Sequence, residues 1–148
     1  MTEDISKFYF EDSAGFLLYR TAIAAKAALR REFQNAGLDV TPEQWTVLCA
    51  LWEEDGLSQG ELAGKTVKDK TTITRILDLL EKKGLAVRRR QESDRRVYEI
   101  YLTEEGRNLR EKLTPVFTGL HARLNDGISE QEVQLMILIL KKLLSNCG

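Results

Sequence analysis

Residues 69–102 read DKTTITRILDLLEKKGLAVRRRQESDRRVYEIYL, and two hydrophobic periodicities follow one another within them. The first half repeats its apolar residues every three or four positions, which is typical of one face of a helix: Ile73, Ile76, Leu77 and Leu80. Gly84 supplies the stop. Beyond it, apolar residues alternate with polar or charged ones, as in strands: Leu85, Val87, Tyr98, Ile100 and Leu102. The sequence therefore predicts a helix followed by a two-stranded hairpin whose charged tip is residues 88–96.

Two helix starts lie close together before this hairpin. Ser58-Gln59-Gly60-Glu61 is a capping box that opens a short helix over residues 61–65, and Asp69 is the N-cap of the next helix. Two short helices joined by a tight connection form a candidate helix-turn-helix. With the hairpin behind them, the pattern predicts a winged helix; a closed all-β fold is excluded because only two strands are available.

Longer helices flank this unit on both sides. Residues 16–33 are rich in Ala and Leu and contain no Gly or Pro, so they predict a first helix. A capping box at Thr41 opens a second helix over residues 42–54. Thr103 starts another long helix, and Pro115 within it should kink or break it.

The last predicted helix begins after Ser129, and its residues 135–140 are apolar on nearly every side. A helix with no polar face must be buried on two sides. One small domain cannot easily supply both sides, so we predict that the terminal helices of two subunits interlock into a homodimer. The alternative is a helix that is buried entirely within its own domain.

The predicted fold class is mainly α with a small β-hairpin: a winged helix-turn-helix plus N- and C-terminal dimerisation helices, with the wing between the fourth and fifth of six helices. The 148 residues form one domain, 1–148. Within it, residues 41–103 form the winged helix-turn-helix lobe, and residues 1–38 and 104–148 form the dimerisation helices.

Positive charge is concentrated in one part of the chain. The net charge is −1, but residues 65–96 carry eleven basic and five acidic side chains, or +6, which leaves −7 for the remainder. One basic module on an acidic body indicates a polyanion that is bound by one surface. The predicted partner is double-stranded DNA.

The exposed face of the helix after Asp69 carries hydrogen-bond donors: Lys70, Thr71, Thr72, Thr74 and Arg75. A helix fits the major groove, where Arg and Lys bond guanine and Thr offers a hydroxyl and a methyl group. A solvated polar face would have a similar composition, and the hairpin favours the DNA interpretation because it adds five arginines: Arg88, Arg89, Arg90, Arg95 and Arg96. Arginines on a projecting loop can enter the minor groove. Asp94 is expected to pair with a neighbouring arginine and to fix the shape of the wing.

Two stretches resemble the MarR (multiple antibiotic resistance regulator) family of transcription regulators: VTPEQWTVL at residues 40–48, and residues 69–106. The second stretch resembles the family's recognition helix, wing and following helix start, and it includes the wing motif Asp94-Arg95-Arg96 and LTEEG from Leu102. The resemblance implies an obligate homodimer that places one recognition helix in each half of a pseudo-palindromic operator. It also implies that Arg96 enters the minor groove with Arg95 beside it. Family members typically repress genes until a small aromatic ligand or cysteine oxidation relieves them. Peroxide-sensing members carry a reactive cysteine in the first helix; residues 12–36 contain none, so that mechanism is not carried over.

Tyr19, Trp45 and Trp52 are candidates for a pocket that binds a small aromatic effector, although aromatic residues at helical spacing are more often core residues.

The sequence has no paired carboxylates near its one histidine, no Gly-rich phosphate loop and no metal-ligand spacing. We therefore expect no enzyme activity, no catalytic residue, no cofactor and no metal. The alternative function is a winged helix that binds proteins without sequence-specific DNA binding, which favours an apolar or mixed-charge exposed face.

The expected location is the cytoplasm. The N-terminus is acidic where a secretory signal would be basic, and the longest apolar run is far too short to cross a bilayer, so no membrane partner is expected. Cys49 lies in an apolar run and Cys147 is next to last, and a structural disulfide between them is not expected.

Overall fold

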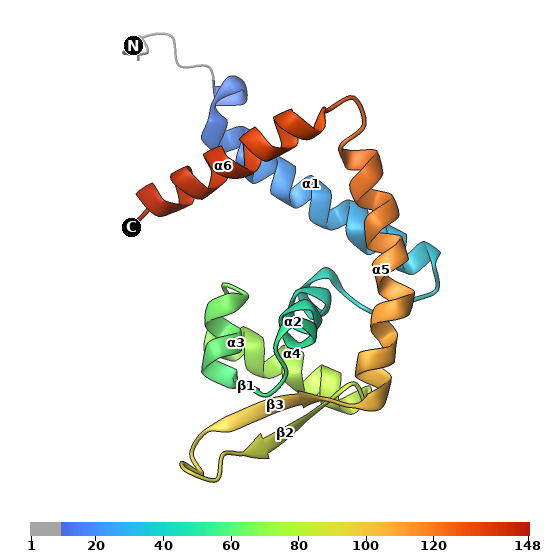
Figure 1. Cartoon of the computed structure of the whole chain (residues 1–148), viewed down its shortest axis with the longest axis vertical. Helices are drawn as coiled ribbons and strands as arrows, with labels where there is room; N and C mark the ends of the chain where they lie inside the picture. The colour runs from blue at the N-terminus through green and yellow to red at the C-terminus, as the bar shows by residue number, and fades with distance from the viewer. Residues whose placement is uncertain (1–9) are drawn as a thin grey trace.

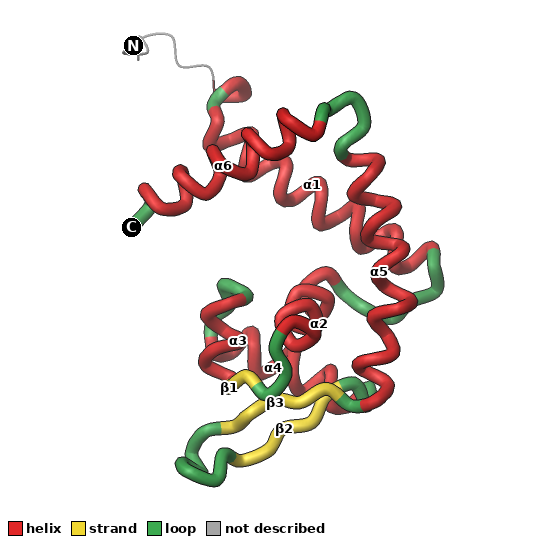
Figure 2. Tube along the Cα trace, viewed as in Figure 1, coloured by secondary structure: helices red, strands yellow, loops and turns green. Residues whose placement is uncertain are grey.

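The structure is a computed structural model that describes residues 10–148, and over this range it shows six α-helices and a small antiparallel sheet (Figure 1; Figure 2). The predicted fold class is confirmed. The elements in chain order are η2 (Phe10–Asp12), α1 (Ala14–Asn35), α2 (Pro42–Glu53), β1 (Leu57–Ser58), α3 (Gln59–Lys65), α4 (Lys70–Lys82), β2 (Ala86–Arg90), β3 (Tyr98–Leu102), α5 (Glu104–Leu124) and α6 (Glu130–Asn146).

The acidic N-terminus on which the predicted location rests lies largely outside the described residues, as does the start of the predicted dimerisation segment 1–38. Helices α1 and α6 cross at the end of the molecule opposite to the wing, and α5 runs from that end to the sheet (Figure 1). None of the helices in residues 10–148 is both long enough and apolar enough to span a membrane.

The core of the winged lobe forms around α4. The buried residues of this helix are those of the predicted stripe: Ile73, Ile76, Leu77 and Leu80. Leu48 and Leu51 of α2 and Ile100 of β3 are buried in the same cluster. Burial of one such side chain stabilises the fold by about 1.5–3 kcal/mol. The four together fix the rotation of α4 about its axis and turn its opposite, polar edge to solvent.

The sheet has one strand more than the sequence predicts. Strand β3 is central: Ile100 lies opposite Leu57 of β1 on one side and opposite Arg88 of β2 on the other. The prediction of only two strands was wrong because β1 comprises two residues, too few for an alternating pattern to be visible. The hairpin of β2 and β3 is the predicted wing.

Helix α5 runs without interruption from Glu104 to Leu124, with Pro115 inside it. The predicted break at Pro115 therefore does not occur, and the alternative of a kink there stays a prediction. Proline removes the hydrogen bond to the carbonyl four residues earlier, which here belongs to Glu111. Pro115 and Glu111 are both exposed, so water can bond the carbonyl and the helix can continue.

Helix α6 has no buried residue within the described chain. Its apolar side chains are exposed by 55% at Leu135, 50% at Leu138 and 47% at Ile139. The alternative of a terminal helix buried in its own domain is therefore wrong. The apolar faces of α6 need a cover that residues 10–148 of one chain do not provide.

The start of α5 is held tightly against the winged lobe. Trp52 Nε1 donates a hydrogen bond of 2.9 Å to the carbonyl oxygen of Gly106. A Cβ atom at Gly106 would lie 2.1 Å from the carbonyl oxygen of Leu85. Only glycine allows this approach of the helix to the chain that enters β2.

We predict that Gly106→Ala destabilises the fold, because the added methyl group must displace the Leu85 carbonyl, at a cost of about 1–3 kcal/mol. Gly119→Ala is the matched control: it lies in the same helix, and its added Cβ would meet nothing within 4 Å. Its better helix propensity should stabilise the fold by up to about 1 kcal/mol. Denaturant unfolding at one fixed protein concentration measures both, and equal stabilities would contradict the constraint at Gly106.

Candidate nucleic-acid interface

Helix α4 begins with a capped and exposed first turn. The Thr72 backbone N–H donates a hydrogen bond of 2.7 Å to Asp69 Oδ1. Hydrogen bonds from Thr72 lower the pKa of the Asp69 carboxyl, helped by the charge of Arg75. Asp69 is therefore ionised at neutral pH, and it fixes the start of the helix that the sequence predicts to enter the major groove.

The predicted DNA-contact residues of α4 lie on its outer edge, with one half-buried member. Lys70, Thr71, Thr74 and Arg75 are exposed, and Thr72 is half-buried. A shallow depression of about 420 Å³ is lined by four of these residues and by one acid: Lys70, Thr71, Thr74, Arg75 and Asp78. The edge thus presents cationic and hydroxyl groups together, although Asp78 interrupts it.

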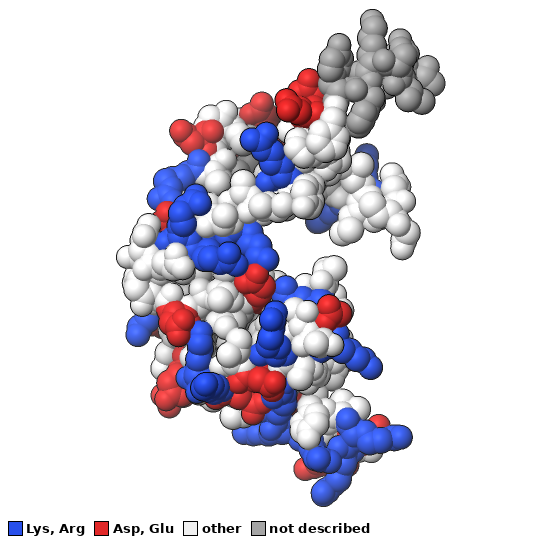
Figure 3. All heavy atoms as spheres, turned by 180° about the vertical axis from the view of Figure 1, so that it is seen from behind, with Lys and Arg blue, Asp and Glu red and all other residues white. Residues whose placement is uncertain are grey.

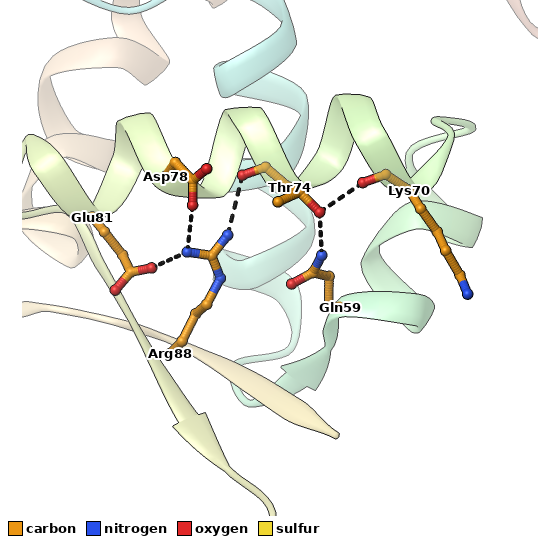
Figure 4. A network of polar contacts seen from close by, with 6 residues as sticks. All are labelled: Gln59, Lys70, Thr74, Asp78, Glu81 and Arg88. Atoms are coloured by element: carbon orange, nitrogen blue, oxygen red, sulfur yellow. Dashed lines mark hydrogen bonds and ion pairs between the residues drawn. The ribbon is translucent and has the colours of Figure 1, made fainter. Parts of the chain in front are cut away.

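Thr74 is more constrained than its neighbours. Its hydroxyl donates a hydrogen bond of 2.7 Å to the Lys70 carbonyl oxygen and accepts one of 2.6 Å from Gln59 Nε2 (Figure 4). The single hydroxyl proton of a threonine is thereby already used. What remains for a ligand is the methyl group, one lone pair and the adjoining amide of Gln59, a residue that sequence analysis did not single out as a site residue.

The five arginines of the wing have different surroundings. Arg89 lies over the ring of Tyr101, with its Cζ 5.0 Å from the ring centroid, and Arg90 lies over Tyr98 at 5.3 Å. Arg90 also donates a hydrogen bond of 3.2 Å to the Arg95 carbonyl oxygen. Arg88 instead points away from the tip and contacts α4 (Figure 4).

The tip of the wing is organised by Asp94. Its Oδ1 accepts hydrogen bonds from the backbone N–H of Arg96 at 3.1 Å and from Arg96 Nε at 3.2 Å. The Arg96 side chain is nevertheless 92% exposed, and Arg95 is also exposed. Lys and Arg side chains gather at the projecting end of the molecule that carries the wing (Figure 3). The tip therefore offers its positive charge to solvent.

The cavity between α1, α2 and α5 has none of the predicted pocket residues, Tyr19, Trp45 and Trp52, in its lining. Trp45 packs against Trp52, with ring centroids 5.5 Å apart, and against Phe117, at 5.1 Å. Tyr19 is 67% exposed. The two tryptophans belong to an aromatic cluster between α2 and α5, and their contact with an effector stays a prediction.

A cavity of about 320 Å³ lies beside this cluster, between α1, α2 and α5. Its lining combines apolar side chains such as Leu29 and Phe117 with the polar or charged Lys26, Glu43 and Lys68. Lys26 Nζ lies 2.5 Å from Glu43 Oε1. Burial opposes ionisation of Glu43, but its contacts with Lys26 lower its pKa on balance. Sequence reasoning missed these residues because they come from three separate helices and from the loop between α3 and α4.

Two further features bear on chemical reactivity: the state of the two cysteines and the grouping of metal-ligating side chains. Burial, reinforced by the charge of Glu53, raises the pKa of Cys49 to about 11, so this thiol is protonated and unreactive near neutral pH. Cys147 is exposed at the other end of the chain. Across the described residues, no three His, Cys, Asp or Glu side chains are grouped to hold a metal ion.

Known regulators share both this fold and parts of this sequence. The family model described as MarR family matches residues 40–98. A MarR family transcriptional regulator from Silicibacter pomeroyi is 30% identical, with a TM-score of 0.80 over 98% of this chain and 97% of that chain. CouR from Rhodococcus jostii RHA1, in complex with p-coumaroyl-CoA, is 29% identical, with a TM-score of 0.80 over 91% and 94% of the two chains. CouR bound to a 23-mer DNA duplex is 25% identical, with a TM-score of 0.82 over 90% and 94%.

A curated relative matches over a shorter range. The HTH-type transcriptional regulator TtmR of Methylorubrum extorquens (strain PA1) is 38% identical over 92 residues, which is 61% of this chain. The match covers 47% of TtmR, so it spans about half the length of that relative.

Proposed function

The chain belongs to the MarR family of transcriptional regulators, and on that basis we propose that it binds double-stranded DNA sequence-specifically, as a homodimer on a pseudo-palindromic operator. In this proposal it represses transcription in the cytoplasm until a small effector binds. The residues proposed to contact DNA are those of the α4 edge, from Lys70 to Arg75, and Arg95 and Arg96 at the wing tip.

The observation that carries the proposal is the pairing of two exposed cationic features in one lobe. The polar edge of α4 is turned outward by the buried stripe on its other side, and β2 of the wing packs against α4. A helix that enters the major groove beside an arginine loop that enters the minor groove uses both features at once. A winged helix used only for protein contacts would have no need of this concentration of arginine.

Dimerisation is proposed from the uncovered side of α6. An apolar groove of about 620 Å³ runs between α1 and α6, and its lining includes Leu17, Leu18, Leu135, Ile139 and Leu140. A second copy of the chain presents the same apolar faces, and an isologous contact would cover both grooves together. A dimer also supplies two recognition helices, which a pseudo-palindromic operator requires.

The cavity between α1, α2 and α5 is the proposed effector site. CouR, a relative of this chain, has been solved with p-coumaroyl-CoA, a ligand whose acyl group is aromatic. In this chain the apolar wall of Leu29 and Phe117 suits an aromatic ring, and the charged Lys26 and Lys68 suit an anionic group on it. An effector there would contact α1, α2 and α5 together, and could change the angle between the winged lobe and the dimerisation helices.

We predict that Arg96→Ala weakens binding to a duplex that the wild-type protein selects from a random library by about tenfold or more, because each dimer loses two groove-inserting cations. The exposed side chain contributes little to folding, so the thermal unfolding midpoint should stay within about two degrees. Fluorescence anisotropy over a range of salt concentrations measures the affinity. For a wild-type dimer that neutralises about eight phosphates, the logarithm of the association constant should fall with the logarithm of the salt concentration with a slope of about −7.

Lys112→Ala is the matched control, since Lys112 is an exposed cation on α5, away from the wing. It should leave the DNA affinity almost unchanged. An unchanged affinity in Arg96→Ala would remove the wing tip from the mechanism. A wild-type protein that binds no duplex would favour the protein-binding winged helix instead.

We predict that Leu140→Glu dissociates the dimer, because it places a charge in the apolar groove between α1 and α6. Sedimentation velocity at micromolar concentration should give a monomer for this variant and a dimer for the wild type. Leu79→Glu is the control: Leu79 lies on α4, is 41% exposed and does not line the groove, so this variant should remain dimeric. A Leu140→Glu protein that sediments like the wild type would contradict the proposed interface.

A further inference from the structure

Arg88 makes a different set of contacts from the other arginines of the wing. Its Nη1 donates hydrogen bonds to Asp78 Oδ1, at 2.8 Å, and to Glu81 Oε1. Its Nη2 donates to the carbonyl oxygen of Thr74 at 3.1 Å. All three acceptors belong to α4 (Figure 4). One guanidinium on the first strand of the wing thus bridges two turns of the recognition helix.

The register of the sheet explains why Arg88 points inward. Arg88 lies directly opposite Ile100 of β3, and side chains of directly opposed residues share one face of a sheet. Ile100 is fully buried, so this face is the one that packs on the core of the lobe. The Arg88 side chain is only 17% exposed. Arg89, the next residue, points to the other face, where it lies over Tyr101.

The two carboxylates that face Arg88 would otherwise hinder binding to a polyanion. The side chains of Asp78 and Glu81 are 63% and 36% exposed, and Asp78 also lines the depression on the outer edge of α4. Unpaired, these acids would repel DNA phosphates near the recognition helix. Arg88 offsets part of this negative charge and at the same time ties the acids to the wing.

Thr74 is held at the same place from two directions. Arg88 bonds its backbone carbonyl, and Gln59 of α3 bonds its hydroxyl. The centre of the exposed edge of α4 is therefore fixed to the wing on one side and to the preceding helix on the other. Thr74 of α4 thus links helix α3 to the wing, and it lies on the edge that is proposed to face DNA.

We infer that Arg88 is a positioning residue of the DNA-binding surface and not a DNA contact. It holds the base of the wing against α4, so that the wing tip and the recognition helix meet adjacent grooves in a fixed relation. This inference rests on the proposed DNA binding and replaces the direct DNA contact that the sequence predicts for Arg88. The arginine of the strand acts through Asp78, Glu81 and Thr74.

The first arm of the test needs no DNA. Amide hydrogen exchange of the full chain is compared between the wild type, Arg88→Gln and the matched control Arg89→Gln, which alters the adjacent arginine on the opposite face. Arg88→Gln should speed exchange in β2 and β3 by about tenfold, because the wing loses its anchor to α4, while Arg89→Gln should leave these rates almost unchanged. Equal effects of the two substitutions would overturn the inference. If Arg88→Gln does not fold, Arg88→Lys keeps the charge but cannot bridge three acceptors, and is measured in its place.

The second arm is a double-mutant cycle on a duplex that the wild-type protein selects from a random library. Arg88→Gln should weaken binding by about tenfold in the wild type, but by less than about threefold in the Asp78→Asn/Glu81→Gln background, where its partners are already neutral. Arg89→Gln should cost the same factor in both backgrounds. An equal loss for Arg88→Gln in both backgrounds would show that Arg88 meets DNA directly, and no loss in either would remove it from DNA binding. Should the wild type bind no duplex, the proposed function fails, and the exchange rates still decide whether Arg88 anchors the wing.

Discussion

The core of the winged lobe admits α4 in one rotation only, because a single face of that helix supplies four of the buried side chains: Ile73, Ile76, Leu77 and Leu80. This constraint determines where every polar group of the helix points. The edge from Lys70 to Arg75 is turned to solvent, and the acids Asp78 and Glu81 come within reach of Arg88 on β2. Burial on one side of α4 thus specifies both the exposed cationic edge and the attachment of the wing to it.

Local signals in the sequence predicted most of the elements. The predicted capping boxes at Thr41 and Ser58 are both present, because such boxes are closed by residues three positions apart and depend little on the rest of the fold. Contacts between distant segments were not predictable in this way. Strand β1 exists only through its pairing with β3, and the inward direction of Arg88 depends on which face of the hairpin meets α4. The cavity beside Lys26 and Glu43 likewise requires three helices to be placed first.

In the proposed function, the helices outside the winged lobe connect DNA binding to dimerisation and to effector binding. Helix α5 is locked to the lobe at its first turn by the close packing of Gly106 and its bond with Trp52, and its other end leads to the uncovered α6. A rigid connection of this kind would let the proposed dimer interface set the spacing of two recognition helices. The proposed effector cavity lies along the same helix, so a ligand there acts on the part that determines this spacing.

In the proposed function, each subunit of a dimer presents one cationic surface that fits the grooves of a DNA duplex. Selection of binding sites from a random duplex library, using the full-length wild-type protein, tests it most directly. The account predicts an inverted repeat with half-site centres about ten base pairs apart, because two recognition helices meet successive major grooves on one face of the DNA. Recovery of no enriched motif, or of an asymmetric motif with a single half-site, would contradict it.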